Sequence, residues 1–220
     1  MAVTRAERVA KFAATDIYPV TCEVLSAGRT DLEILRQVAH GGAKVIQLRD
    51  KTSSRRGLYK KAAAFRELTA ELGMLLIIND YVDIALAVDA DGVHLGQGDL
   101  PIEVARQLAP EQIIGSSCHS LPDIHEAMRL GADYTNLGPV FATQTKDTPV
   151  VPLGLDLVRE AHAKFSHPVT VMGGIKLHHV SDLAAAGARH LAVVTAVTQA
   201  DDIAAETAVW RNAIQTAMAG

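Results

Sequence analysis

Several short apolar runs in the sequence end in charged or amide side chains whose types suit the binding of a phosphorylated molecule. One run continues as Gln47-Leu48-Arg49-Asp50-Lys51, and extended alternation places Gln47, Arg49 and Lys51 on one side. A guanidinium group binds phosphate oxygens through paired hydrogen bonds, and a nearby ammonium group adds a second positive charge. The segment therefore predicts a binding site for a polyanion.

Two carboxylates follow the next two apolar runs. Asn79-Asp80 ends the first of these runs, and Gly96-Gln97-Gly98-Asp99 follows the second. If the runs are neighbouring parallel strands, Asp80 and Asp99 stand close together and offer the oxygen ligands that Mg²⁺ combines with water and substrate phosphates. The same two residues also suit helix starts, since Asp is a common N-cap and Pro101 fits a first helical turn.

Polar or glycine-rich segments also follow the later apolar runs. Residues 138–152 form the longest irregular stretch, in which Thr143-Gln144-Thr145-Lys146 supplies two hydroxyl groups and an ammonium group. A loop of this length is usually functional, although a solvated polar loop has the same composition. Gly173-Gly174 and Val194-Thr195 end two further runs, where backbone N–H groups can surround a phosphate. A Gly-Gly pair also fits a simple tight turn.

Other reactive side chains are weaker candidates. Ser117 and His119 could hydrogen-bond a substrate, although His119 could equally cap a helix or pack. His94 lies inside an apolar run and is interpreted as a core histidine with its hydrogen bonds satisfied. Cys118 has no general base at a recognised spacing, so a thiol nucleophile is not expected. Trp210, at helical spacing in the last segment, is interpreted as a packing residue.

Taken together, the stronger candidates suggest two anionic pockets at one place. The first is a metal-assisted pocket for a diphosphate, and the second is a glycine-lined pocket for a phosphate monoester. Cations and a metal ion that neutralise the charge developing on pyrophosphate lower the barrier to its departure. These residues therefore suggest a transfer reaction with pyrophosphate as the leaving group.

The elements that must position these residues alternate between short apolar runs and stretches of helical periodicity. Eight runs are predicted as strands, at residues 17–21, 44–48, 75–79, 92–95, 113–116, 134–137, 169–172 and 191–194. The helical stretches include 31–40, 55–72 and 121–130, and repeated Gly-Ala pairs suit helix ends. Eight βα repeats predict an α/β protein with a single (β/α)₈ TIM barrel, whose site lies where the strands end. Residues 1–16 are predicted as a short N-terminal helix.

The composition supports one α/β domain over residues 1–220. Hydrophobic residues make up 49% of the chain and aromatic residues only 4%, as aliphatic parallel strands require. A formal charge of −4, without a long basic stripe, argues against nucleic acid as a partner. No apolar run approaches the roughly 18 residues of a membrane span. Cys22 and Cys118 form neither a disulfide framework nor a zinc spacing, which predicts a cytoplasmic location.

Four strings occur in order in the chain: QLRDK, INDYVDIALAVDADGVHLGQGDLP, GADYTNLGPVFATQTK and VMGGI. Together they resemble the thiamine-phosphate synthase family, from about Tyr18 to the last predicted strand. The resemblance implies condensation of a pyrimidine diphosphate with a thiazole phosphate, plain or carboxylated, to thiamine phosphate and pyrophosphate. It implies small phosphorylated molecules as partners, with neither nucleic acid nor membrane, and a homo-oligomer is compatible with it.

The resemblance also implies roles for particular residues. Mg²⁺, as a single ion per subunit, would be held by Asp80 and Asp99. The implied catalytic residues are Arg49, Lys51, Ser117 and Lys146. The implied contacts with the pyrimidine diphosphate are Gln47, Leu48, Arg49, Asp50, Lys51, Asn79, Ser117 and Lys146. The implied contacts with the thiazole phosphate are Thr143, Gln144, Thr145, Gly174, Val194 and Thr195.

The mechanism that the resemblance implies is dissociative: pyrophosphate departs, a pyrimidinylmethyl cation forms, and the thiazole nitrogen captures it. Such a route needs positioned charge more than a strong base. The chain departs from the family pattern at Cys22, where an Asp is common, and in the segment Gly115-Ser116-Ser117-Cys118-His119. Neither change removes a phosphate or metal contact, so we expect an altered pyrimidine pocket with activity retained.

Three other functions fit parts of the pattern. A thiazole tautomerase would share the barrel and use a residue such as His119 for proton transfer, but would not need the diphosphate-binding residues. A Schiff-base aldolase needs an inward lysine at a strand end, and Lys44 stands at the wrong end of its predicted strand. A binding protein for thiamine intermediates would bind ligand without turnover, and would not require charge directed at a leaving group.

Overall fold

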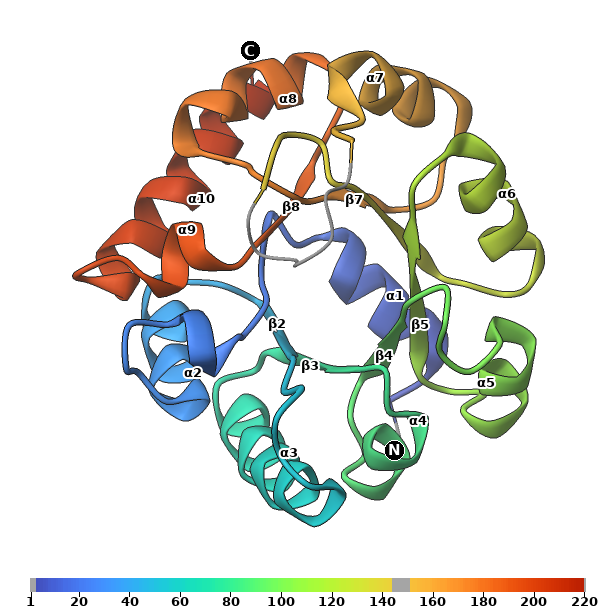
Figure 1. Cartoon of the computed structure of the whole chain (residues 1–220), viewed down its shortest axis with the longest axis vertical. Helices are drawn as coiled ribbons and strands as arrows, with labels where there is room; N and C mark the ends of the chain where they lie inside the picture. The colour runs from blue at the N-terminus through green and yellow to red at the C-terminus, as the bar shows by residue number, and fades with distance from the viewer. Residues whose placement is uncertain (1–2, 144–150, 220) are drawn as a thin grey trace.

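A computed structural model describes residues 3–143 and 151–219 of the chain. Eight parallel strands form one sheet in the order β1-β8-β7-β6-β5-β4-β3-β2, and helices surround the strands as an outer ring (Figure 1). Val20, just after β1, bridges to Gln47 of β2, and this contact brings the two edges of the sheet together. The predicted (β/α)₈ TIM barrel is confirmed.

The strands begin and end close to the predicted positions. They are β1 Ile17–Pro19, β2 Val45–Leu48, β3 Leu75–Asn79, β4 Gly92–Leu95, β5 Ile113–Cys118, β6 Tyr134–Leu137, β7 Val169–Val171 and β8 His190–Val193. β1 is shorter than predicted, because only Val20 beyond it bridges to a neighbour. β5 is longer than predicted, because Ser117 and Cys118 pair with Asn136 and Leu137.

The helices follow the strands in regular alternation. They are α1 Arg5–Ala13, α2 Asp31–His40, α3 Arg55–Glu71, α4 Val82–Ala87, α5 Ile102–Leu108, α6 Leu121–Arg129, α7 Gly154–Lys164, α8 Val180–Ala185, α9 Thr195–Thr198 and α10 Ile203–Ala219, with 3₁₀ turns at Glu23–Leu25 and Leu177–His179. Gly42, Gly131 and Gly187 of the Gly-Ala pairs adopt positive φ, as glycines that end helices do. In the described part of the chain, no helix has the length and apolar character needed to cross a lipid bilayer.

The predicted N-terminal helix is α1, which lies inside the ring of strands in the view of Figure 1 rather than in the outer ring of helices. Thr4 and Glu7 form a capping box at its start. Phe12 near its end is buried and stacks on Tyr134, with ring centroids 4.2 Å apart. Helix α1 therefore packs an aromatic side chain against the barrel interior.

Two half-buried histidines lie on the side of the barrel where the strands begin. His162 belongs to α7, and His167 precedes β7, where its Nε2 lies 2.9 Å from Thr135 Oγ1. His162 Nε2 and His167 Nδ1 are buried without a hydrogen-bond partner among the described residues. Burial lowers the pKa of each imidazole to about 4, so both are neutral at pH 7.

We expect the free energy of unfolding to fall as the pH drops from about 6.5 to about 4. The unfolded chain protonates these histidines near pH 6.5, whereas the folded chain resists until about pH 4. The contribution of the two histidines to stability is therefore fully present above this window and is lost within it. The loss is up to about 1.4 kcal/mol per pH unit for each extra proton bound by the unfolded chain. Urea unfolding at several pH values measures this dependence.

A double variant, His162→Gln with His167→Gln, should show a weaker pH dependence in this window. His125→Gln, at an exposed position of α6, is the matched control and should keep the wild-type dependence. An unchanged pH dependence in the double variant would show that other groups cause the acid sensitivity.

Candidate active site

Strand β2 directs Gln47 into the barrel and Leu48 away from it. Gln47 is buried, and its Nε2 donates to Tyr18 Oη at 2.8 Å. Leu48 packs in the hydrophobic core, so any contact between it and a ligand would come from its backbone. Arg49 follows the strand, where its N–H donates to Thr21 Oγ1 at 3.0 Å and its Nη1 lies 3.5 Å from Cys22 Sγ. Alternation thus places Gln47 and Arg49 on the same side of the segment, as predicted.

Asp50 holds the segment after β2 in place through its side chain. Its carboxylate is only 2% exposed and lies 2.6 Å from Lys61 Nζ. Oδ1 also accepts from the backbone N–H groups of Thr52 and Ser53, at 2.9 Å each, and Oδ2 accepts from Ser53 Oγ at 2.7 Å. A contact between Asp50 and a ligand would therefore be made by its backbone.

Lys61 of α3 lies among three carboxylates from separate elements. Besides Asp50, its Nζ contacts Glu23 Oε2 at 2.9 Å and Asp31 Oδ2 at 2.7 Å. Burial opposes both shifts, but hydrogen bonds from Lys61, Ser53 and Thr52 hold the pKa of Asp50 well below its usual range. The three carboxylates in turn raise the pKa of Lys61. Lys61 therefore ties the segments after β1 and β2 to α3.

Lys51, Asp80 and Asp99 form a second charged group at the ends of β2, β3 and β4. The Lys51 ammonium contacts the Asp80 carboxylate directly. Burial raises the pKa of Asp80, Lys51 opposes that shift, and the adjacent Asp99 carboxylate raises it further. Asp99 Oδ2 accepts from the backbone N–H of Gly96 at 2.7 Å. The structure thus brings the two predicted metal ligands close together.

The backbone at Asp80 is strained, because its φ of +66° lies in the left-handed region that most residues avoid. Non-glycine residues in this region cluster at functional sites. Asn79, the last residue of β3, is half-buried and precedes it directly. Asp80 is therefore held at the mouth of the barrel, and its alternative role as a simple helix cap is not seen, since Tyr81 is the N-cap of α4.

The carboxylates of Asp80 and Asp99 fit a Mg²⁺ ion. The Asp99 carboxylate disfavours the charged form of Asp80, and a divalent cation held by both would relieve that repulsion. Among residues 3–143 and 151–219, no three His, Cys, Asp or Glu side chains are arranged to enclose a metal ion. Two carboxylates, with the remaining positions left to water and phosphate, suit Mg²⁺ in particular.

Ser117 of β5 meets His94 of β4 inside the mouth. His94 Nε2 lies 3.0 Å from Ser117 Oγ, and His94 Nδ1 lies 2.9 Å from Tyr134 Oη. His94 is 5% exposed, which confirms it as a buried histidine with bonded ring nitrogens. The contact between His94 and Ser117 was not predicted from the sequence, and neither were roles for Tyr18 and Tyr134. A glycine inside a strand marks a position where another group approaches closely. Gly115, which pairs with Tyr134 in the sheet, could therefore have indicated this packing.

The other weak candidates have structural roles. His119 Nδ1 lies 2.5 Å from the carbonyl oxygen of Gly138, and its backbone N–H donates to Asp123. Cys22 and Cys118 are buried free thiols, and burial raises the pKa of Cys118 to about 12. Such a thiol is a poor nucleophile at neutral pH, as expected. Trp210 is buried, which confirms it as a packing residue.

The opposite side of the mouth is formed by the ends of β6, β7 and β8. Gly173 and Gly174 have φ of +96° and +65°, and a Cβ on Gly174 would lie 2.3 Å from the carbonyl oxygen of Ala142. Val194 is the N-cap of α9, and Thr195 begins that helix. Thr143 is half-buried and has an interaction partner. Gln144, Thr145 and Lys146 lie outside the described residues.

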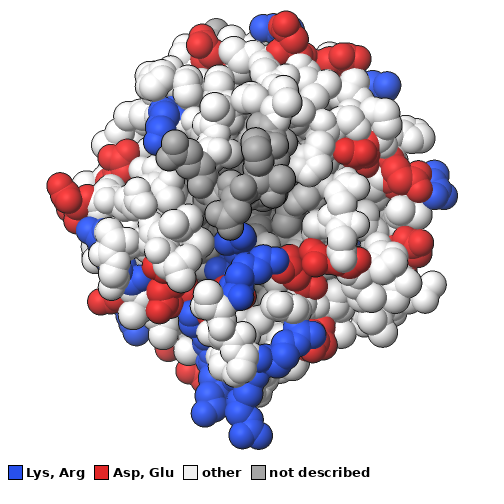
Figure 2. Space-filling model, viewed as in Figure 1, with Lys and Arg blue, Asp and Glu red and all other residues white. Residues whose placement is uncertain are grey.

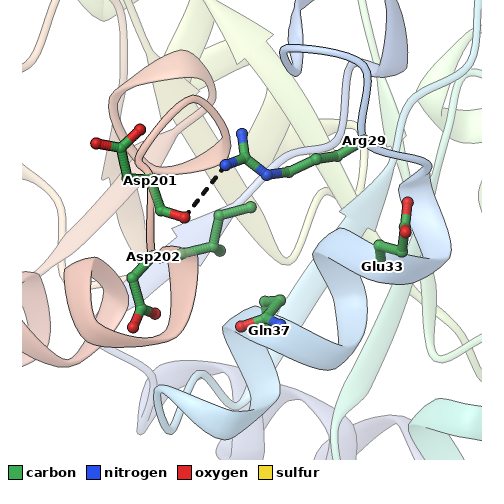
Figure 3. A pocket seen from close by; sticks show the side chains of 6 residues that line it. Arg29, Glu33, Gln37, Asp201 and Asp202 are labelled. Carbon is green, nitrogen blue, oxygen red and sulfur yellow. Dashed lines mark hydrogen bonds between the residues drawn. The ribbon is translucent and has the colours of Figure 1, made fainter.

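Two further features are seen on the surface of the molecule. Lys and Arg side chains gather over the start of α3 and the segment before it (Figure 2). A separate pocket of about 320 Å³ lies between α2 and the start of α10, where Arg29 donates to the carbonyl oxygen of Asp201 at 3.2 Å (Figure 3). None of the predicted site residues lines this pocket, so the strand ends remain the candidate active site.

A family model described as thiamine monophosphate synthase matches residues 17–197. The chain belongs to this family. The thiamine-phosphate synthase of Chloroflexus aurantiacus is 44% identical over 189 residues, covering 86% of this chain and 88% of its own. That of Shouchella clausii is 41% identical over 202 residues, covering 91% of this chain and 97% of its own.

The solved structure of a thiamine phosphate pyrophosphorylase from Pyrococcus furiosus superposes with a TM-score of 0.87 at 35% identity, covering 95% of this chain and 99% of that one. The resemblance drawn from the four strings is thereby confirmed. The expected class of enzyme, a transferase that synthesises thiamine phosphate, is confirmed with it.

We expect Lys61→Met to lower the free energy of unfolding by at least about 3 kcal/mol, because it leaves the nearly buried carboxylates of Asp31 and Asp50 without their cation. Lys60→Met, at the exposed neighbouring position, should change it by no more than about 0.5 kcal/mol. Urea denaturation followed by circular dichroism measures both. Equal stability of the two variants would rule out the stabilising role of the Lys61 cluster.

Proposed function

We propose that the chain joins a pyrimidine diphosphate to a thiazole phosphate, plain or carboxylated, and releases pyrophosphate. The observation that carries this proposal is the pair Asp80 and Asp99 beside Lys51, at the ends of neighbouring strands. Two carboxylates next to cationic side chains suit a divalent ion and the diphosphate that shares it. The Gly173-Gly174 turn across the mouth would bind a phosphate monoester through its backbone N–H groups.

On the diphosphate side, Arg49 and Lys51 would neutralise the leaving group, and Gln47, Asn79 and Ser117 would orient the pyrimidine. The backbone of Leu48 and Asp50 would complete that contact. Lys146, from the segment outside the described residues, would add a second ammonium group to the leaving group. Asp80 and Asp99 would hold one Mg²⁺ ion, which when bound supplies positive charge to the diphosphate oxygens.

On the thiazole side, the phosphate would be bound by backbone and hydroxyl groups. Gly174 lies in a turn without a side chain, and Val194 and Thr195 lie where α9 begins. Thr143, together with Gln144 and Thr145 from the segment outside the described residues, would contact the same substrate. The two phosphorylated substrates would then meet over the centre of the barrel.

The reaction proposed for this site is dissociative. The C–O bond to the diphosphate breaks, and pyrophosphate leaves with the electron pair. The lone pair of the thiazole nitrogen then forms a C–N bond with the pyrimidinylmethyl cation. Fixed charges around the leaving group lower the barrier to the first step, and no step requires a strong base.

The structure supports this reaction over the alternatives. The side chain of His119, which a tautomerase would use for proton transfer, contacts the carbonyl oxygen of Gly138. Lys44, the lysine considered for a Schiff base, is exposed and immediately precedes β2. Charged groups directed at a leaving group also favour catalysis over simple ligand binding.

Partners and location follow the same proposal. A net charge of −4 supports small phosphorylated molecules rather than nucleic acid as partners. Two free, buried thiols support a reducing, cytoplasmic setting. Association of copies into a homo-oligomer is compatible with this activity.

Incubation of the protein with Mg²⁺ and both synthetic substrates should yield thiamine phosphate and pyrophosphate. We expect Asp80→Ala and Asp99→Ala each to lower kcat at least about 100-fold, because each removes an oxygen ligand of the ion. Both products can be quantified by chromatography and a coupled pyrophosphate assay.

Asp83→Ala is the matched control, since Asp83 is exposed on α4 and pairs with Arg55 away from the carboxylate pair. It should retain wild-type activity. Full activity in both Asp80→Ala and Asp99→Ala, or equal wild-type activity with and without Mg²⁺ after chelation, would remove the metal assignment.

A further inference from the structure

A chain of buried hydrogen bonds crosses the barrel interior and joins Gln47 to Ser117. Gln47 Nε2 donates to Tyr18 Oη at 2.8 Å, and Tyr18 Oη lies 2.8 Å from Tyr134 Oη. Tyr134 Oη lies 2.9 Å from His94 Nδ1, and His94 Nε2 lies 3.0 Å from Ser117 Oγ. The five side chains come from β1, β2, β4, β5 and β6. The chain therefore links two residues of the proposed pyrimidine site through the interior.

The end of this chain at Gln47 indicates its direction. An amide NH₂ group can only donate, so Tyr18 accepts from Gln47. Either hydroxyl could donate between Tyr18 and Tyr134, and donation from Tyr18 is the arrangement that leaves its buried hydrogen bonded, as buried polar groups generally are. Tyr134 then donates its single hydrogen to His94 Nδ1. A neutral imidazole whose Nδ1 accepts carries its hydrogen on Nε2, and this hydrogen is donated to Ser117.

The surroundings of Tyr18 and Tyr134 keep both side chains as hydrogen-bond donors. Burial raises the pKa of both Tyr18 and Tyr134, so each retains its hydroxyl hydrogen at neutral pH. Phe12 stacks on the Tyr134 ring, and a Cβ on Gly115 would lie 2.0 Å from that ring. The Tyr134 hydroxyl is therefore held by packing as well as by hydrogen bonds.

We propose that His94 is a positioning residue, which the Gln47–Tyr18–Tyr134 chain holds in the Nε2–H tautomer so that Ser117 accepts from His94 and donates its own hydrogen to the substrate. Ser117 is thereby a directed donor for an oxygen of the diphosphate or a ring nitrogen of the pyrimidine. Gln47 donates one amide hydrogen to Tyr18, and its carbonyl oxygen is available as an acceptor. The kinetic part of this proposal rests on the proposed function, and the tautomer does not.

The tautomer of His94 can be measured on the unmodified protein. Long-range ¹H–¹⁵N correlation spectra of protein labelled at its histidines distinguish protonated from unprotonated ring nitrogens, and His94→Gln identifies the signal among the nine histidines. We expect Nε2 protonated and Nδ1 unprotonated. A hydrogen on Nδ1 would mean that the chain runs in the opposite direction, with Ser117 donating to His94, and would overturn the proposal.

Tyr134→Phe tests the positioning role, because it removes one hydroxyl and keeps the packed ring. We expect kcat to fall about three- to tenfold, as loss of one neutral hydrogen bond predicts. In a Ser117→Ala background the same substitution should cause no further fall, because it acts through Ser117. Equal falls in both backgrounds would indicate a merely structural effect and would reject the positioning role.

Tyr59→Phe is the matched control, since Tyr59 is 44% exposed on α3, and it should leave kcat unchanged. If the wild-type protein forms no thiamine phosphate, the proposed function fails, while the spectra still decide the tautomer. If Tyr134→Phe does not fold, the wild-type spectra alone confirm or overturn the assigned direction of the chain.

Discussion

Repulsion between two carboxylates at the ends of β3 and β4 is the constraint around which this site is built. Burial disfavours the charged form of Asp80, and the adjacent Asp99 carboxylate adds to that cost. Lys51 compensates by direct contact, and the left-handed backbone at Asp80 holds its carboxylate at the mouth. Groups held against repulsion in this way are arranged before a cation or polyanion arrives, which is what electrostatic catalysis requires.

The segment after β2 connects this site to the Lys61 cluster. Asp50 turns inward to Lys61, Thr52 and Ser53, while its neighbour Lys51 turns outward to Asp80. Ionic contacts therefore hold the segment on one side and leave a cation exposed on the other. Because Lys61 also contacts residues after β1 and at the start of α2, the position of Lys51 depends on three elements together.

The interior of the barrel carries polar side chains where aliphatic layers usually dominate. Tyr18, Tyr134 and His94 occupy that space, and Phe12 of α1 packs against them. A polar network of this kind is stable only when its members are paired, and it then holds each member in one orientation. The N-terminal helix and the C-terminal ends of β2 and β5 are thus parts of one packed unit.

The sequence by itself determined the repeat, the class of barrel, most strand positions and the identity of the charged strand ends. It could do so because apolar runs, helical periodicity and glycine helix ends are local signals, and parallel strands direct their ends to one face. Only the tertiary structure decided that Asp50 faces Lys61, that His94 meets Ser117 and that Tyr18 meets Tyr134. These contacts join residues far apart in the chain, and their geometry arises when the barrel closes and its side chains pack.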